Sequence, residues 1–377
     1  MTASDNTRFD YHMANLHTLL KAAMLVELTT IPAYLHAAFS IEDLGAEHVN
    51  HAPREAIRSV VVEEMLHLTL IANILNATGG RPALDQSAWI PQYPCSLFPK
   101  ALAACTLRDP TTGEDRPIVV SEGINVHLRP FSQEQVKLFE SIEAQHSASC
   151  GAVDGKIDSI GRLYAGLKSE LCQMVDLYGR EAVFCGDPAR QVGPEYYYAA
   201  GGRLTAIDPS RHTEDPLTQA QTALDLIANE GEGLEHGHSV FDGIARPDET
   251  GADIAHVFRF REILKQTRYR DGDCWNEDPT GDAMAVDWKS VWPLADDPDP
   301  DDPALTCETA NAMREFDRRY SVVLRTINGG LLGEPELLKT AVVGMFSLKY
   351  RGMALMRTPR GDGRNAAPAW RWLDKGE

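Results

Sequence analysis

The stretch VVEEMLHL at residues 61–68 places ionisable side chains on the apolar face of a predicted helix. Positions three apart in a helix lie one turn apart on the same face, so Glu64 and His67 point the same way. Burying an unpaired charge is costly, so this pair must be neutralised, paired or bound to an ion. The face is predicted to be buried because it also carries Ile57, Val60, Val61, Leu68, Ile71 and Leu75.

Hydrophobic periodicity predicts an all-α chain. Residues 10–40 and 53–77 read as two long helices that form a hairpin. Pro32 interrupts the first of them, which predicts a kink near Thr30. Further helices are expected at 132–145, 154–178, 218–233, from 253 onward, 306–328 and 335–356.

Two long stretches between these helices lack helical periodicity. Residues 83–131, which include WIPQYPCSLFPK, and residues 195–208 read as irregular excursions. A long connection of this kind is often functional, or it crosses between two halves of a bundle. We therefore expect a helical bundle with inserted loops in residues 1–270. An acidic linker and a C-terminal helical extension packed on the bundle follow in residues 271–377, with a poorly ordered tail.

Composition argues against several classes of function. The chain has 377 residues and a net charge of −19, which disfavours binding to nucleic acid or to an anionic membrane surface. We find neither an apolar run of the ~20 residues that span a bilayer nor the pattern of a secretion signal. The seven cysteines form no C-x-x-C pair, which argues against zinc modules and a disulfide framework and favours a cytoplasmic location.

A second inward carboxylate strengthens the interpretation of Glu64 and His67. Glu27 falls on the stripe of the first helix that also holds Leu20, Met24 and Ile31. A Glu on one helix and a Glu-x-x-His on its neighbour form half of a di-metal carboxylate centre. Carboxylates can bridge two cations, and imidazole supplies a terminal nitrogen ligand. The first half-site is therefore predicted to be Glu27, Glu64 and His67.

The second half-site is left with several alternatives. If the helix at 218–233 is unbroken, Glu230 leans inward and Glu232 points outward, but the neighbouring glycines weaken that projection. Glu143, His146 and Glu170 are each interpreted as surface residues, because acids are mostly exposed, with Glu143 or Glu170 as the remaining candidates for a ligand from the third helix. The fourth-helix region also offers Glu235, His236, His238 and His256.

These segments together resemble the ferritin-like domain of the iminophenylpyruvate dimer synthase family, which includes VioB-type proteins of bisindole pigment biosynthesis. The resemblance rests on LHTLLKAAMLVELTTIPAYLHAAFSI, VVEEMLHLTLIANILNATGG, IANEGEG and AHVFRFREI. It extends to PQYPCSLFP, AVDWKSVWP, INGG and AVVGMFSLKYRGMALM, and so covers most of the chain.

The resemblance implies a ferritin-like four-helix bundle and a set of metal ligands. The ligands implied are Glu27, Glu64, His67, Glu232 and His256. One departure is Arg162, which stands where the family pattern has an acid in the third helix and which calls a second metal into question. The large extra region of VioB-type proteins is also absent, so the pigment reaction is not implied.

The expected function is a non-haem iron oxidase or oxygenase, with one or two iron ions, in secondary metabolism. Its expected partners are O2 and a small organic substrate, aromatic or derived from an amino acid, together with a second copy of the chain or a partner biosynthetic enzyme. Trp89, Tyr93 and Tyr197 are the predicted substrate-binding residues, since aromatic loops can line a ligand pocket. The alternatives are a ferroxidase without an organic substrate and a metal-free helical scaffold.

Overall fold

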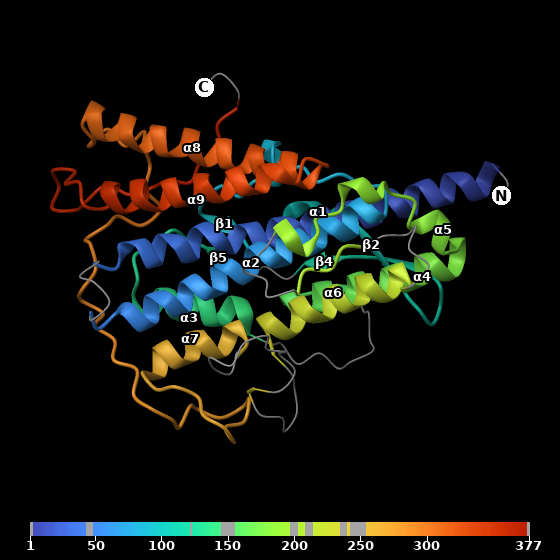
Figure 1. Ribbon diagram of the computed structural model, residues 1–377, viewed down its shortest axis with the longest axis horizontal. Coiled ribbons are helices and arrows are strands. Elements are labelled where there is room, and N and C mark those ends of the chain that lie inside the picture. The colour runs from blue at the N-terminus through green and yellow to red at the C-terminus, as the bar shows by residue number, and fades with distance from the viewer. Residues whose placement is uncertain are drawn as a thin grey trace.

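Two long antiparallel helices form the centre of the molecule in the computed structural model (Figure 1). They are α1 (Ala3–Ser40) and α2 (His51–Ala77). α1 runs through Pro32 without a break, and near that residue the Tyr93 hydroxyl donates to the carbonyl oxygen of Thr29 at 2.8 Å. The structure describes residues 3–42, 48–120, 123–144, 155–196, 203–207, 214–233, 240–241 and 254–374.

The other two helices of the bundle are each divided into two segments. α3 (Gln133–Glu143) and α4 (Ile160–Tyr178) take the third position, while α6 (Pro216–Gly231) and α7 (His256–Lys265) take the fourth. α3 packs against α7, and α4 packs against α6. Both divisions were predicted from sequence at nearly these positions. They bring four helix ends to the middle of the bundle (Figure 1).

The connection from α2 to α3 contains short strands and 3-10 turns rather than a helix, as expected for a crossover. Strand β1 pairs with β5 and β2 with β3, both antiparallel, whereas β4 pairs with β6 in parallel. The elements of this connection are η1 (Ser87–Trp89), β1 (Cys95–Ser96), η2 (Lys100–Ala104), β2 (Thr106–Arg108), β3 (Asp115–Pro117), β4 (Val119–Val120) and β5 (Asn125–Val126). The remaining short elements are β6 (Lys156–Ile157), α5 (Arg180–Val183), η3 (Pro188–Arg190) and η4 (Pro194–Tyr196).

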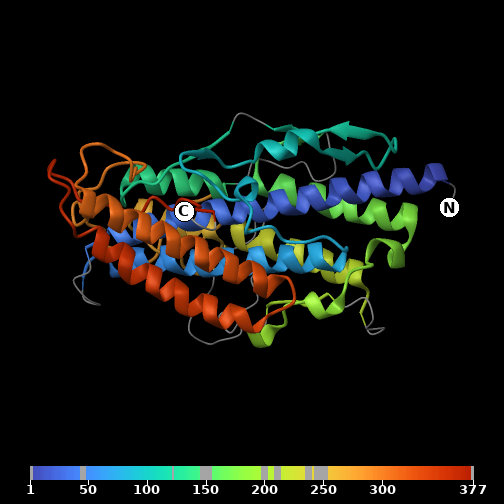
Figure 2. The same cartoon turned by 90° about the horizontal axis from the view of Figure 1, so that it is seen from above.

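A C-terminal helical hairpin lies across the bundle (Figure 2). It consists of α8 (Cys307–Leu331) and α9 (Glu336–Leu355). The chain after α9 was predicted to be poorly ordered, but Trp370 is only 2% exposed and packs edge-on against Phe316 at a ring distance of 4.9 Å. That prediction was wrong, because the tail supplies a large aromatic side chain to the core.

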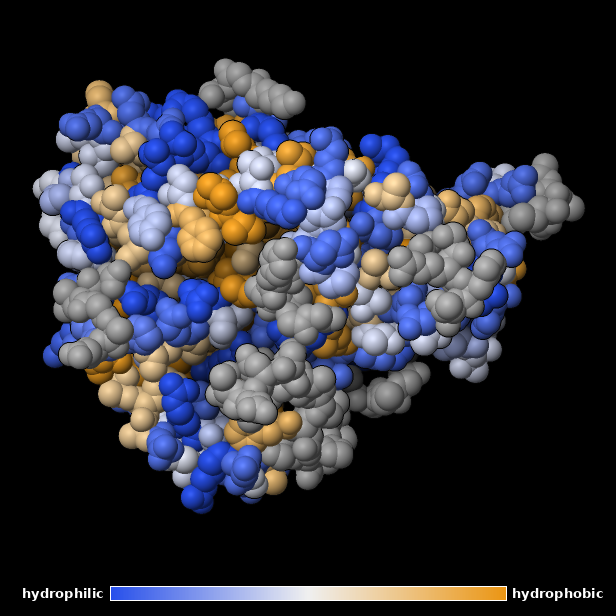
Figure 3. Space-filling model, in the orientation of Figure 1, coloured by the Kyte–Doolittle hydropathy of each residue, from blue (hydrophilic) through white to orange (hydrophobic). Residues whose placement is uncertain are grey.

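Two helices are long and apolar enough to span a membrane by length and composition, although none was expected from the sequence. They are residues Asn6–Ser40 of α1 and all of α2, and 94% and 89% of their most apolar windows are buried inside the protein. Their apolar character is therefore explained by their position in the core of a large bundle. Elsewhere the surface is mixed, with apolar side chains gathered over α8 and α9 (Figure 3), where Val343 and Phe346 are exposed.

Candidate metal centre

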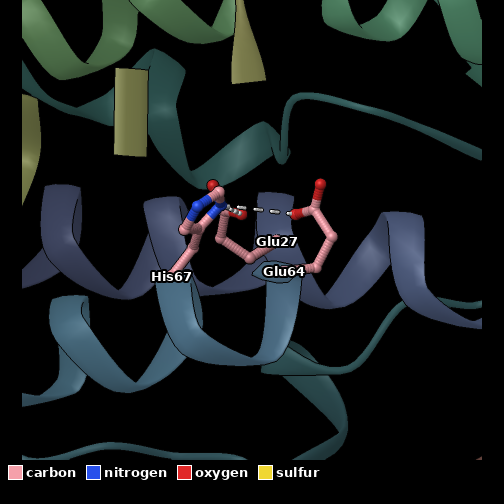
Figure 4. Close-up of side chains that lie close together, drawn as sticks. All are labelled: Glu27, Glu64 and His67. Atoms are coloured by element: carbon pink, nitrogen blue, oxygen red, sulfur yellow. Dashed lines mark ion pairs between the residues drawn. The ribbon is translucent and has the colours of Figure 1, made fainter. Parts of the chain in front are cut away.

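One triad of possible metal ligands joins α1 to α2. Glu27, Glu64 and His67 are all buried, and one ligand atom from each lies within 4.8 Å of the others. His67 Nδ1 is 3.4 Å from Glu27 Oε2 and 3.9 Å from Glu64 Oε2, and the three side chains point toward one another (Figure 4). Helical spacing in α2 produces this arrangement, because Glu64 and His67 lie one turn apart on the inward face.

A second triad joins α2 to α3 and α7. It consists of Glu64, Glu143 and His256, again with ligand atoms within 4.8 Å of one another. His256 Nδ1 is 3.1 Å from Glu64 Oε1 and 3.6 Å from Glu143 Oε2. Glu64 therefore belongs to both triads, with one carboxylate oxygen facing each histidine. We call Glu27, Glu64, His67, Glu143 and His256 the inner cluster.

Two further glutamates, Glu63 and Glu230, lie against the Nε2 atoms of the two histidines, and we call them the outer carboxylates. Glu230 Oε2 is 2.9 Å from His67 Nε2, and Glu63 Oε2 is 2.9 Å from His256 Nε2. A carboxylate on the second ring nitrogen fixes the orientation of a metal-binding imidazole and raises its basicity. Each histidine is thus oriented with Nδ1 toward the inner cluster.

Two tyrosines donate hydrogen bonds to Glu27 and Glu143, the two glutamates that each belong to a single triad. The Tyr164 hydroxyl donates to Glu27 Oε1, and the Tyr34 hydroxyl donates to Glu143 Oε1 at 2.5 Å. Both tyrosines are fully buried. The two halves of the inner cluster are therefore built alike, each with a terminal carboxylate, a tyrosine, a histidine and an outer carboxylate around the shared Glu64.

Buried charges dominate the electrostatics of the cluster. Burial alone would lower the pKa of His67, but its bonds to Glu230 and Glu27 outweigh burial and raise that pKa to about 10. Burial likewise opposes the charged form of His256, yet its carboxylate neighbours raise the pKa well above the ordinary value. Burial and the neighbouring Glu27 and Glu143 raise the pKa of Glu64. Without a metal the cluster therefore retains protons that a bound cation would have to displace.

The donor set fits a pair of divalent transition-metal ions. Three carboxylates and two imidazoles are ligands that iron, manganese and zinc accept. His256 Nδ1 is completely buried and makes no hydrogen bond among the described residues, although it is directed at two carboxylates. A metal ion would satisfy this nitrogen and would offset the repulsion among the three inner carboxylates.

Four of the five ligands predicted from sequence are brought together, namely Glu27, Glu64, His67 and His256. The structure places the fifth, Glu232, elsewhere. α6 ends at Gly231, and Glu232 Oε1 instead accepts a hydrogen bond from the Gly161 amide at the start of α4, at 2.6 Å. Glu230, the last residue but one of α6, occupies the inward position.

The interpretation of Glu143 and Glu170 as surface residues was wrong, because they are only 2% and 3% exposed. Glu143 joins the inner cluster, whereas Glu170 accepts the Arg108 amide at 3.0 Å. His146, Glu235, His236 and His238 lie outside the described residues. Arg162 lies 3.5 Å from Asp158, and it is Tyr164 that α4 directs at Glu27.

Of the predicted substrate-binding residues, the structure describes Trp89 and Tyr93, and the contacts that it shows for them are not with the inner cluster. Trp89 is half-buried, with the Lys21 ammonium 5.7 Å from its ring centre, and the Tyr93 hydroxyl is bonded to the backbone of α1. Tyr197 lies outside the described residues. Residues around the candidate centre that sequence reasoning did not identify are Glu63, Tyr34, Tyr164, Arg203 and Arg259. Glu63 stands beside Glu64 in the motif, but nothing in the sequence marks Arg203, which lies in an irregular segment.

Comparison with known proteins agrees with this architecture. A family model described as Ferritin-like matches residues 20–265, which contain every residue of the inner cluster. Among solved structures, the chain is similar to a ferritin-like protein from Caulobacter vibrioides, with 20% sequence identity and a TM-score of 0.58. That match covers 96% of this chain and 98% of the other, and at this identity it shows the fold alone. No curated protein sequence matches the chain.

Proposed function

The chain belongs to the ferritin-like family, and we propose that it is a non-haem di-iron enzyme that uses O2 to oxidise a small organic molecule. The observation that carries this proposal is the pair of carboxylate–histidine triads that share Glu64. A di-metal carboxylate centre typically has four carboxylates and two imidazoles, and the two triads supply three of these carboxylates and both imidazoles.

Each ion would have its own terminal ligands. Glu27 and His67 would hold one iron, Glu143 and His256 would hold the other, and Glu64 would bridge them. Iron bound in this way supplies the one-electron chemistry that allows O2 to react with an organic substrate. The chain's own residues orient the ligands: Glu230 and Glu63 hold the imidazoles, and Tyr164 and Tyr34 hold the terminal carboxylates. Burial of all five ligands limits the access of bulk water.

The inner cluster has a first half with Glu27 and His67 and a second half with Glu143 and His256. A cavity near the second half offers a place for the substrate. It has a volume of about 680 Å³ and lies between the first half of α2, α7 and residues 268–271. This volume falls within the range of small-molecule sites. Its lining includes Ala56, Ser59, Phe241, Arg259 and Tyr269. No residue of the inner cluster lines this cavity, but Arg259 does, and its Nη2 lies 2.9 Å from Oε2 of Glu63, the outer carboxylate of His256.

The kind of substrate remains a prediction. An aromatic or amino-acid-derived molecule is supported by the resemblance to the iminophenylpyruvate dimer synthase family. Contacts from Trp89, Tyr93 and Tyr197, the use of O2, a second copy of the chain or a partner enzyme, and a cytoplasmic location also remain predictions.

The decisive experiment is to count iron. The purified chain is reconstituted anaerobically with Fe(II), desalted and analysed for iron per chain, alongside Glu64→Gln and Glu170→Gln. We expect two irons in the wild type and in Glu170→Gln, whose carboxylate is equally buried but lies outside the cluster. Glu64→Gln should lose both ions, because its side chain belongs to both triads. Wild-type protein without iron would make the cluster a metal-free polar network and would end the enzyme proposal.

The main rival is a ferroxidase that oxidises iron without an organic substrate. The long connection between α2 and α3 and the C-terminal α8–α9 hairpin argue against it, because storage bundles pack as repeated compact units. The two functions separate when reduced, iron-loaded protein is given O2 together with either excess Fe(II) or an added organic compound. Continued uptake of Fe(II) and O2 into a mineral favours the ferroxidase, and O2 consumption that depends on an added organic compound favours the oxidase.

A further inference from the structure

The C-terminal hairpin exposes a group of large apolar side chains. Nine such side chains are exposed in the described part of the chain, and five of them lie on α8 and α9: Val322, Val342, Val343, Phe346 and Tyr350. Figure 3 shows apolar side chains gathered over these two helices. We call the five residues the hairpin patch. A contiguous apolar patch marks an interaction site, whereas a single exposed apolar side chain is ordinary.

Helical spacing makes the patch continuous along α9. Val343, Phe346 and Tyr350 are separated by three and four residues, so they form one stripe. The opposite side of the helix packs on the protein, with Leu348 and Gly352 buried. The stripe therefore faces away from the core and is open to a partner.

The second helix of the hairpin widens this stripe. A Cβ atom placed on Gly344 of α9 would lie 2.7 Å from Val323 Cγ2 of α8, so the two helices pack closely at this level. Val322, the neighbour of Val323, is exposed there. The patch thus spans both helices.

The charges along α9 make the stripe complementary to a second copy of itself. Glu334 and Glu336 are exposed at the start of the helix, and Arg351 and Arg357 are exposed at its end. Glu336 Oε2 is 2.7 Å from Lys339 of the same helix, which leaves Oε1 for another partner. If two copies of α9 lie antiparallel about a two-fold axis, the acidic end of each helix meets the basic end of the other.

A two-fold axis that passes just after Phe346 satisfies both features. Positions equally distant from such an axis face each other in the two copies. Val343 then lies opposite Tyr350 of the partner subunit, and Glu336 lies opposite Arg357 of the partner subunit. The apolar contact and the ion pair each occur twice, which is the self-complementarity that a symmetric dimer requires.

The overall charge of the chain also favours this surface for self-association. Residues 307–355 contain seven bases and five acids, although the whole chain has a net charge of −19. Two copies of an acidic protein repel each other, so they meet most easily where the excess of acids is absent. An anionic membrane suits the patch less well, because Glu334 and Glu336 flank the stripe.

We propose that the chain forms a homodimer in which the two α9 helices pack antiparallel through the hairpin patch. The hairpin offers a face ~30 Å long and ~20 Å wide, and this area approaches the ~800 Å² per partner that is typical of a stable interface. The metal ligands come from α1, α2, α3 and α7, so each copy keeps a complete inner cluster. The inference is therefore independent of the proposed function.

The first test is the mass of the full chain in solution without added metal. Sedimentation velocity at micromolar concentrations should give about twice the 41.5 kDa of one chain. Val343→Lys should weaken the dimer at least about tenfold, because it brings like charges into an apolar contact. Val119→Lys is the matched control, since Val119 on β4 is 61% exposed and Val343 is 69% exposed. We expect this control to remain a dimer.

A cysteine beside the axis tests the antiparallel arrangement. Ser347→Cys should form a disulfide-linked dimer under mild oxidation, because each side chain lies near its own copy. Wild type and Val119→Cys measure the background from the native cysteines. A dimer without this cross-link would overturn the antiparallel arrangement.

Three other results would overturn the inference, and none of them affects the iron count that tests the proposed function. They are a monomeric wild type, a dimer that persists in Val343→Lys, and a monomer whose binding to lipid vesicles is lost in Val343→Lys. The last result would assign the hairpin patch to a membrane surface.

Discussion

Asp317 on α8 is a buried acid remote from the metal centre. It is 1% exposed, and its Oδ1 accepts the Arg371 amide at 3.1 Å. Burial raises its pKa from 3.8 to about 7, more than its hydrogen bonds lower it. The folded protein therefore holds a proton at Asp317 over a pH range in which the unfolded chain has released it.

This difference predicts that Asp317 lowers stability as the pH rises. Between these two pKa values the native state binds more protons at Asp317 than the unfolded chain does, so the free energy of unfolding falls as the pH rises from about 4 to 7. Above pH 7 the whole destabilisation due to the buried charge of Asp317 is present. The cost has an upper limit of ~4 kcal/mol, at about 1.4 kcal/mol per pH unit. Asp317→Asn should remove it, and urea unfolding should show a larger gain at pH 8 than at pH 5. An equal effect at the two pH values would contradict this account.

At the scale of elements, the division of α6 and α7 determines which acids reach the metal centre. Helical projection favoured Glu230 as the inward residue, and the structure places Glu230 against His67. The family resemblance favoured Glu232, but α6 ends at Gly231, so helical periodicity does not extend to that side chain. Instead its carboxylate lies at the N-terminus of α4, where an anion is favourable.

Replacing these two acids in turn tests the assignment. Glu232→Gln should lower the free energy of unfolding by ~1 kcal/mol, the scale of a charge at a helix N-terminus, and should leave the iron content unchanged. Glu230→Gln should instead weaken iron binding, because His67 loses its outer carboxylate. Both variants are compared by urea unfolding without metal and by iron analysis after reconstitution. Loss of iron in Glu232→Gln would restore the assignment that the resemblance implied.

How far the sequence predicts this protein depends on whether a feature is local. The stripes of α1 and α2 and the Glu64–His67 spacing follow from helical periodicity, so the first half-site was predicted from the sequence. Glu143 was left as one of two candidates from the third helix and was interpreted as a surface residue, because it is the last residue of α3 and its burial depends on how that helix end packs against α7. Arg203 contacts Glu63 and Glu230 from an irregular segment, and such contacts have no sequence periodicity.

At the scale of the whole molecule, the C-terminal tail joins the α8–α9 layer to the bundle. The Trp370 ring packs against Phe316 and Tyr320 of α8 and is stacked 6.3 Å from Phe39 of α1. Trp370 has a φ of 56°, in the left-handed region, which costs a non-glycine residue ~1 kcal/mol or more. The burial of this ring therefore outweighs the backbone strain.

Two substitutions at this position should separate packing from strain. Trp370→Ala should destabilise the protein by ~3–5 kcal/mol because a large buried ring is lost. Trp370→Gly loses the same ring but also relieves the left-handed backbone, so it should be less destabilised than Trp370→Ala by about 1 kcal/mol. Urea unfolding of both variants measures the difference. If the glycine variant is the less stable of the two, the left-handed conformation carries no cost at this position.

Metal binding should show whether the bundle and the C-terminal extension unfold as one unit. The inner cluster draws its ligands from α1, α2, α3 and α7, and none comes from α8 or α9. The extension is nevertheless tied to the bundle by polar contacts: Asn76 Nδ2 donates to the Leu331 carbonyl oxygen at 2.7 Å, and the Leu84 amide donates to Asn328 Oδ1 at 3.0 Å.

A ligand that binds only the native state adds ~2.7 kcal/mol to the free energy of unfolding when its free concentration is a hundred times its dissociation constant. Amides that exchange only through global unfolding gain this protection wherever they lie. We therefore expect the slowest amides of α8 to gain as much protection as those of α2 when Fe(II) is bound anaerobically, measured by hydrogen–deuterium exchange with mass spectrometry. Glu64→Gln should show no gain in either helix. A gain confined to residues 1–270 would mean that the C-terminal extension unfolds independently of the metal-binding bundle.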